Sequence, residues 1–296
     1  MCGIVGLHLR DPQLQPQLGR LLESMLCGVV ERGPDSAGVA VYGDVRRCPE
    51  GHAAVSVLLP AGVGPLDVED ALRALDPRVT PAGDTTVIAA PTGVDALVAA
   101  VRAAVPDAVV VGSGRDLTVY KGTGHPRELA ATYDLVHASG WQALAHTRMA
   151  TESAVTPAGC HPFSVGPDQC LVHNGSFSNH ASIRRELVRE GVAFDSENDS
   201  EVGARFVASR LAQGEDLEKA LLALRETFDG FYTLLVTSAD GFAVVRDPIA
   251  CKPAVIAETD AWVAMASEFR ALAPLPGIES ARLYEPEPGR VYAWTR

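Results

Sequence analysis

The sequence lacks several features that would assign it to a common class of protein. No apolar run approaches the about 20 residues that a membrane-spanning helix needs, and the N-terminus has no basic region followed by a long apolar core. The six cysteines form no C-x-x-C pair and the eight histidines show no H-E-x-x-H spacing, so His161 beside Cys160 is expected to be structural. We therefore expect a cytoplasmic protein with no metal site, no cofactor and no disulfide framework.

Positive charge is also scarce. The chain has 25 Lys and Arg against 37 Asp and Glu, a net charge of -12, which disfavours nucleic acid and anionic membrane surfaces as partners. The apolar fraction of 47% and charged fraction of 21% are typical of a globular protein. A chain of 296 residues can bury a large core, and we expect one domain over residues 1–296 that carries an insert.

The first half of the chain predicts a main body interrupted by a small lobe. Apolar residues from Leu14 to Val30 recur at helical spacing, and a glycine- and proline-rich loop at 32–38 leads into a strand at 39–42. Residues 50–123 are expected to form the inserted α/β lobe, because strand and helix patterns alternate there. The expected strands and helices of the lobe fall at 55–59, 68–75, 85–90, 94–105, 109–111 and 117–120.

The second half alternates strand blocks with a central helical stretch. Helices are predicted near 180–190, from 198 and over 217–228, with Asp199 or Ser200 as a candidate N-cap. Asn174-Gly175 follows an apolar strand, which in isolation favours a hairpin turn. The pattern shows no repeated β-α-β register, so we expect an α+β fold of two packed sheets covered by helices.

The second residue of the chain combines two reactive groups. If Met1 is removed, Cys2 carries both a thiol and a free α-amine, and such an amine titrates at about 7.7–8.0. One residue could then supply nucleophile and general base. The alternative is that Cys2 is a small apolar residue at the start of a buried strand.

Four further residues complete a chemical set with Cys2. The Arg148 guanidinium can grip an α-carboxylate, and the Asp199 carboxylate can receive an α-ammonium. The Asn174 amide and the Gly175 backbone N–H can stabilise an oxyanion. Hydrolysis of a free amino-acid amide requires these groups together.

These motifs and their order resemble the class II glutamine amidotransferases, which are N-terminal nucleophile hydrolases. The resemblance covers nearly the whole chain outside the insert, and it implies a four-layer α-β-β-α sandwich. The matching segments are MCGIVG at 1–6, RGPDSAG at 32–38, HTRMAT at 146–151, HPFS at 161–164, HNGSFSN at 173–179, NDSE at 198–201, FDGF at 228–231, Arg246-Asp247 with Lys252-Pro253, and ASE at 266–268.

The resemblance assigns a role to each candidate residue. It implies that Cys2 is the nucleophile with its own α-amine as base, that Asn174 and Gly175 form the oxyanion hole, and that L-glutamine is the substrate. It implies that Arg148, helped by Thr151, holds the substrate carboxylate, and that Asp199 holds the ammonium. Arg32 and Asp35 fall in the loop that supports the site in this family.

Departures from the family pattern suggest a subfamily. Met149 stands where the aminosugar-synthase branch has Trp, and Glu152 where that branch has His. The chain ends at Arg296, so we expect no phosphosugar, phosphoribosyl or adenylating domain to follow. The sequence is most similar to the separate amidotransferase subunit of glutamate-synthase-like assemblies such as N-methylglutamate synthase, which implies a synthase partner that receives ammonia.

Two other functions fit the same residues. The first is hydrolysis of another γ-glutamyl amide or γ-glutamyl peptide, since such substrates present the same amino-acid head. The second is a non-catalytic subunit that senses glutamine.

Overall fold

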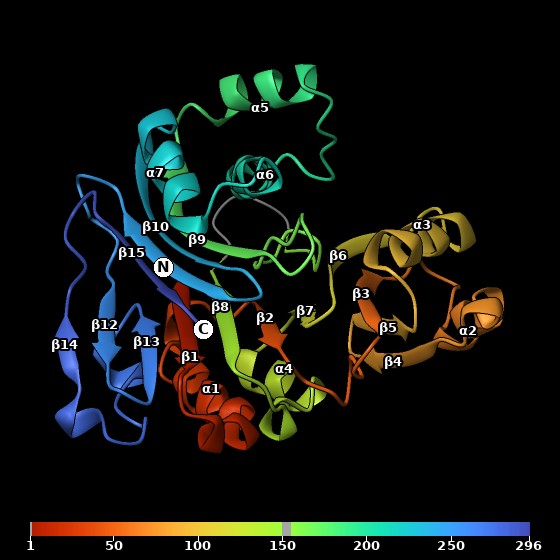
Figure 1. The fold of residues 1–296 in the computed structure, drawn as a ribbon, viewed down its shortest axis with the longest axis horizontal. Coiled ribbons are helices and arrows are strands. Elements are labelled where there is room, and N and C mark those ends of the chain that lie inside the picture. The colour runs from red at the N-terminus through yellow and green to blue at the C-terminus, as the bar shows by residue number, and fades with distance from the viewer. Residues whose placement is uncertain (1, 150–154) are drawn as a thin grey trace.

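Two antiparallel sheets stacked face to face form the centre of the protein. The computed structural model describes residues 2–149 and 155–296 (Figure 1). The larger sheet contains, in spatial order, β14 (Arg282–Tyr284), β12 (Val255–Glu258), β13 (Trp262–Ala266), β1 (Gly3–Leu9), β8 (Gln142–Arg148), β2 (Ser36–Tyr42) and β7 (Leu117–Thr123). The smaller sheet contains β15 (Val291–Thr295), β11 (Gly241–Arg246), β10 (Gly230–Thr237) and β9 (Cys170–Phe177).

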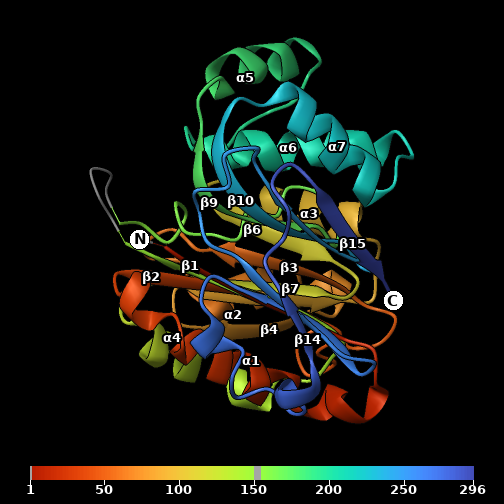
Figure 2. The ribbon, with the colours of Figure 1, turned by 90° about the vertical axis from the view of Figure 1, so that its left-hand side faces the viewer.

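Helices cover the outer face of each sheet. In Figure 2, α1 (Leu18–Cys27) and α4 (Pro126–Thr132) lie below the larger sheet, while α5 (His180–Arg189), α6 (Asp199–Ala212) and α7 (Leu217–Thr227) lie above the smaller one. The layers therefore follow the order α-β-β-α, which confirms the expected fold class. Short 3₁₀ turns occur at Pro12–Gln17, Val30–Arg32, Arg73–Leu75, Leu135–His137, Phe269–Ala271 and Ile278–Ser280.

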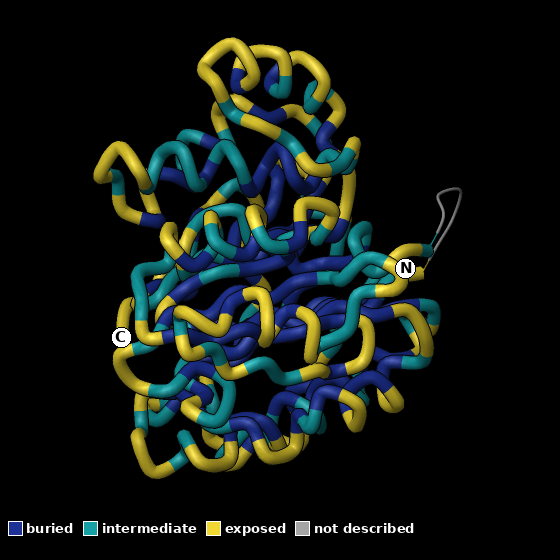
Figure 3. Tube along the Cα trace, turned by 90° about the vertical axis from the view of Figure 1, so that its right-hand side faces the viewer, coloured by how far each residue is buried: buried dark blue, intermediate teal, exposed yellow. Residues whose placement is uncertain are grey.

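The central strands have nearly continuous apolar sequences because each sheet is covered on both faces. Every residue of β1 is buried, because Ile4 faces the smaller sheet while Val5 and Leu7 face α1. Full burial of one such side chain contributes about 1.5–3 kcal/mol to folding. Figure 3 shows the result as a dark buried band through both sheets with exposed backbone around it. Within the described ranges, no helix is long and apolar enough to cross a membrane.

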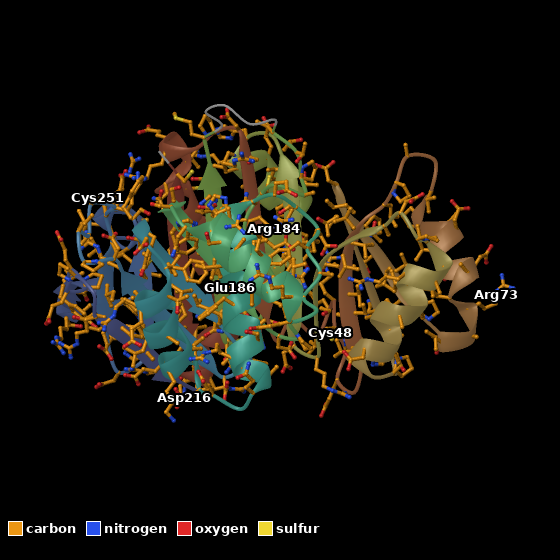
Figure 4. All side chains as sticks on the ribbon, turned by 90° about the horizontal axis from the view of Figure 1, so that it is seen from above. Cys48, Arg73, Arg184, Glu186, Asp216 and Cys251 are labelled. Atoms are coloured by element: carbon orange, nitrogen blue, oxygen red, sulfur yellow. The ribbon has the colours of Figure 1, made fainter. Side chains whose placement is uncertain are left out.

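The inserted segment forms a third sheet beside the main body. It contains β3 (Ala53–Leu58), α2 (Pro65–Ala71), β4 (Arg78–Ala82), β5 (Thr85–Ala90), α3 (Val94–Ala104) and β6 (Val109–Gly114), with the strands in the order β4-β5-β3-β6. Both helices pack on one face, whereas Ala54, Val87 and Ala89 on the other face pack into the core of the main body. Figure 4 shows the lobe from above, with Arg73 at its outer end.

Several local expectations need correction. β7, which we expected inside the 50–123 insert, pairs with β2 in the larger sheet, and we therefore propose that the separate unit spans 53–114. β4 is a strand that the sequence analysis did not name; it contains Pro81 and lies at the edge of its sheet, where proline is tolerated. The helix expected from Leu14 begins at Leu18, after a 3₁₀ turn.

Candidate active site

The N-terminal strand is held firmly at its first residues. Gly3 pairs with Thr147 of β8, and Val5 pairs with Ala266 of β13. The backbone N–H of Ile4 donates to Ser267 Oγ at 2.9 Å, and the N–H of Ser267 donates to the Ile4 carbonyl, also at 2.9 Å. Cys2 therefore projects from the anchored end of a central strand.

Two side chains then fix Cys2 itself. Its carbonyl oxygen accepts hydrogen bonds from Arg32 Nε at 2.9 Å and from Asn174 Nδ2 at 3.0 Å. The Arg32 side chain is only 9% exposed, and its Nη1 donates to Glu268 Oε1 at 2.8 Å. This hydrogen bond lowers the pKa of Glu268 below its usual value. Arg32 thus connects the residue before β1 to Glu268, just after β13; its expected supporting role stays a prediction.

A single cavity of about 730 Å³ brings the main candidates together. Cys2, Arg148, Asn174, Gly175 and Asp199 all line it, although they come from the residue before β1, from β8, from β9 and from α6. The remaining lining residues are His146, Met149, Gly159, His161, His173, Glu197, Asn198, Ser200 and Lys252.

The other expected site residues lie elsewhere. Arg32 and Asp35 are not among the lining residues. The backbone N–H of Asp35 donates to the Arg148 carbonyl at 3.2 Å, and this hydrogen bond holds the end of β8. Thr151 lies outside the described residues, and its expected role stays a prediction.

Asn174 and Gly175 lie within strand β9, so the hairpin favoured by the dipeptide alone is wrong. Gly175 pairs with Tyr232 of β10. Its φ of +144° and the position of Phe231 O, only 1.9 Å from where a Cβ would be, both require glycine. Asn174 uses one amide N–H on the Cys2 carbonyl, and a primary amide carries a second. Both residues can therefore direct an N–H toward a ligand beside Cys2.

Arg148 and Asp199 supply opposite charges within the cavity. Arg148 Nη1 lies 3.3 Å from the Gly159 carbonyl. Asp199 is the first residue of α6, and its Oδ2 accepts from the Phe177 backbone N–H at 2.8 Å. Asn198, rather than Asp199 or Ser200, caps the helix by accepting from the Ser200 N–H at 2.9 Å. The Asp199 carboxylate is thus not needed for the N-cap.

Three buried histidines form an uncharged wall of the cavity. The rings of His146 and His161 are 4.2 Å apart, and those of His161 and His173 are 6.4 Å apart. Burial lowers the pKa of His146 to about 3 and of His173 to about 4, and that of His161 falls well below its usual value. At neutral pH the three imidazoles are neutral, so the ionic groups of the cavity are Arg148, Asp199, Glu197 and Lys252.

Sequence reasoning missed part of this lining. His146, His161, His173 and Lys252 lie inside the matched motifs, but residue spacing alone gave no reason to place them in one cavity. Ser200 was considered only as a helix cap. Among the described residues, no group of three or more His, Cys, Asp or Glu side chains is arranged to hold a metal ion.

The sequence of this chain is similar to those of known proteins. Residues 133–285 match the family described as "Glutamine amidotransferase domain". The chain is 50% identical over 300 residues to the "Glutamine amidotransferase-like protein GlxB" of Rhizobium meliloti (strain 1021), covering 99% of this chain and 98% of the relative. It is 28% identical over 186 residues to the amidophosphoribosyltransferase of Methanocaldococcus jannaschii, covering 62% of this chain and 39% of that one.

A solved structure shares the fold. The glutamine phosphoribosylpyrophosphate amidotransferase from B. subtilis superimposes with a TM-score of 0.62 and 19% sequence identity, covering 99% of this chain and 47% of that chain. The four-layer architecture is therefore shared with that amidotransferase. Together with the family match and the full-length relative, it shows that this chain belongs to the glutamine amidotransferase domain family.

Proposed function

We propose that the chain hydrolyses the side-chain amide of L-glutamine with Cys2 as nucleophile, giving glutamate and ammonia. The observation that carries this proposal is the single cavity shared by Cys2, Arg148, Asn174, Gly175 and Asp199. These residues come from three separate elements and from the residue before β1, so their convergence is a property of the whole fold. The proposal requires removal of Met1, which gives Cys2 a free α-amine.

In the proposed reaction, the α-amine of Cys2 takes the thiol proton and the thiolate attacks the amide carbon of glutamine. The oxyanion receives hydrogen bonds from the second Asn174 N–H and the Gly175 backbone N–H, and each such donor contributes about 3–4 kcal/mol. The protonated amine then donates its proton to the departing ammonia, leaving a γ-glutamyl thioester. Water attacks the thioester by the reverse proton transfers and releases glutamate.

The same cavity would select an amino acid by its head group. We assign Arg148, with Thr151, to the substrate carboxylate, and Asp199 to the substrate ammonium. Arg32 and Asp35 act indirectly, since one holds the Cys2 carbonyl and the other holds the end of β8. The catalytic unit comprises residues 1–296 with the lobe inserted in it.

We further propose that the ammonia passes to a synthase subunit in the cytoplasm. The motif pattern that resembles glutamate-synthase-like and N-methylglutamate synthase assemblies supports this partner. Purification of the native complex, followed by mass spectrometry of the copurifying chains, tests it; a chain that purifies alone and at full activity would contradict it.

The catalytic proposal is tested by glutaminase assays on matched cysteine variants. Cys2→Ala is expected to abolish turnover, whereas Cys27→Ala, a control at the end of α1, retains it. A chain that keeps Met1, verified by intact mass, is also expected to be inactive. Normal turnover by that chain would refute the α-amine as base.

Arg148→Lys tests the carboxylate clamp. Lysine keeps the charge but cannot form a planar two-point contact, so the Michaelis constant for glutamine is expected to rise by about tenfold or more. An unchanged Michaelis constant would remove Arg148 from the clamp.

Hydrolysis of other γ-glutamyl amides remains the second candidate, because Arg148 and Asp199 contact only the amino-acid head in this scheme. A panel of γ-glutamyl amides and peptides, assayed for amine release, distinguishes it from glutamine hydrolysis. Covalent labelling of Cys2 by a glutamine-like diazo ketone separates both from a non-catalytic sensor.

A further inference from the structure

We infer that Ser200 and His173 are positioning residues that orient Asp199 toward the α-ammonium of the substrate, an inference that rests on the function proposed above. The three side chains form a continuous chain in the cavity wall. Ser200 Oγ lies 3.3 Å from Asp199 Oδ1 and 2.9 Å from His173 Nδ1. Ser200 and His173 are almost fully buried, while the Asp199 side chain is 21% exposed on the cavity side.

Each oxygen of the Asp199 carboxylate has its own donor. Oδ2 accepts from the backbone N–H of Phe177, and Oδ1 accepts from the hydroxyl of Ser200. With both oxygens fixed, the carboxylate cannot rotate, and its remaining lone pairs are presented to the cavity.

The hydroxyl has one hydrogen and two neighbouring acceptors, so its direction fixes the tautomer of His173. A carboxylate is a stronger acceptor than a neutral imidazole nitrogen, and Ser200 therefore donates to Asp199. The Ser200 oxygen then accepts from His173, which places the proton on Nδ1 and leaves Nε2 bare. His173 Nε2 has no hydrogen-bond partner among the described residues, which is consistent with an Nε2 that carries no proton.

The neutral state of His173 matters for the charge on Asp199. His173 Nδ1 lies 4.0 Å from Asp199 Oδ1, so a protonated ring would compete with the substrate ammonium for the carboxylate. Burial, which includes contact with the Phe177 ring at 4.4 Å, lowers the pKa of His173 and outweighs the opposing effect of Asp199; the nearby Lys252 charge also disfavours the protonated state. A neutral imidazole orients the carboxylate through Ser200 and leaves its charge for the ligand.

The test compares two amides that differ only at the α-carbon. L-Glutamine carries the ammonium that Asp199 would bind, and glutaramate carries hydrogen in its place. Ser200→Ala is expected to lower kcat/KM for glutamine about tenfold, mainly through KM, with little change for glutaramate. Ser200→Thr keeps a hydroxyl and is expected to restore selectivity, and Ser209→Ala on the same helix is the matched control.

His173 is tested by substitution and by spectroscopy. His173→Asn places an amide N–H near the position of Nδ1 and is expected to preserve selectivity for glutamine, whereas His173→Leu is expected to reduce it. The ¹⁵N spectrum of the wild-type protein is expected to show a neutral His173 protonated on Nδ1. An equal loss on both amides in Ser200→Ala, or no loss at all, would overturn the inference.

The two proposals fail in different ways. A wild-type protein that hydrolyses neither amide refutes the proposed function. A His173 protonated on Nε2 or on both nitrogens refutes the positioning chain, whether or not the protein is active.

Discussion

Gly175→Ala tests how closely β9 and β10 approach beside the cavity. A Cβ at this position would lie 1.9 Å from Phe231 O and 2.7 Å from Tyr232 Cα, and both atoms belong to the paired backbone of β10. No side-chain rotation relieves these overlaps. The two strands must separate, and the Asn174 and Gly175 N–H groups must move with them.

The magnitude follows from two contributions. The φ of +144° lies in a region that side chains disfavour, at a cost of about 1–3 kcal/mol. Separation of the paired strands adds a similar amount, and we expect a total loss of about 3–5 kcal/mol in the free energy of unfolding. This is a large part of the about 5–15 kcal/mol that stabilises an ordinary domain.

A matched glycine isolates the effect of the close approach. Gly191 also has a positive φ, +93°, but a Cβ there would meet nothing within 4 Å. Gly191→Ala is therefore expected to cost only about 1–2 kcal/mol. Urea unfolding of both variants, compared by midpoint at constant slope, measures the difference. Equal losses would show that the approach of β9 to β10 does not require glycine.

Three further substitutions test buried or clustered charge by unfolding measurements. Asp168→Asn is expected to cost about 2–3 kcal/mol, because its carboxylate accepts from three backbone N–H groups in the β6–β7 turn; no loss would contradict this. Burial lowers the pKa of Lys121 to about 8 from the ordinary value of 10.5. Between these two pH values the unfolded chain binds more protons than the folded chain, so the free energy of unfolding rises with pH. Lys121→Met is expected to remove this rise and to add about 3 kcal/mol to the free energy of unfolding at pH 7. The lowered pKa of Glu268 stabilises the folded chain fully above pH 4.5, and this stabilisation is lost as the pH falls through the folded-state pKa. Glu268→Gln is therefore expected to weaken the loss of stability in acid, measured by thermal melts at about pH 3–6. An unchanged pH profile would contradict the Arg32 contact.

The order of helices and strands could be predicted largely from periodicity, but some positions depend on contacts that the sequence does not display. Asn174-Gly175 reads as a turn because its dipeptide is typical of hairpins, whereas in the fold Gly175 is needed for close pairing with β10. β7 has an ordinary strand pattern, and only its pairing with β2 decides which sheet it joins.

The candidate site could be predicted as a set of chemical groups but not as a geometry. Cys2, Arg148 and Asp199 were identified from what their side chains can do and from the order of motifs. The connection from Asp199 through Ser200 to His173 spans 26 residues of sequence and two elements, and no periodicity relates them. Burial and hydrogen-bond partners, which give these residues their proposed roles, depend on the folded structure.

The anchoring of β1 has a consequence for local motion at this end of the chain. Chain ends usually open and close with little free energy, whereas the Ile4 amide lies on a central strand and is bonded to Ser267. Its exchange with deuterated water should then require opening of the larger sheet itself. Residue 2, which directly precedes this strand, would then be held in place until the larger sheet opens.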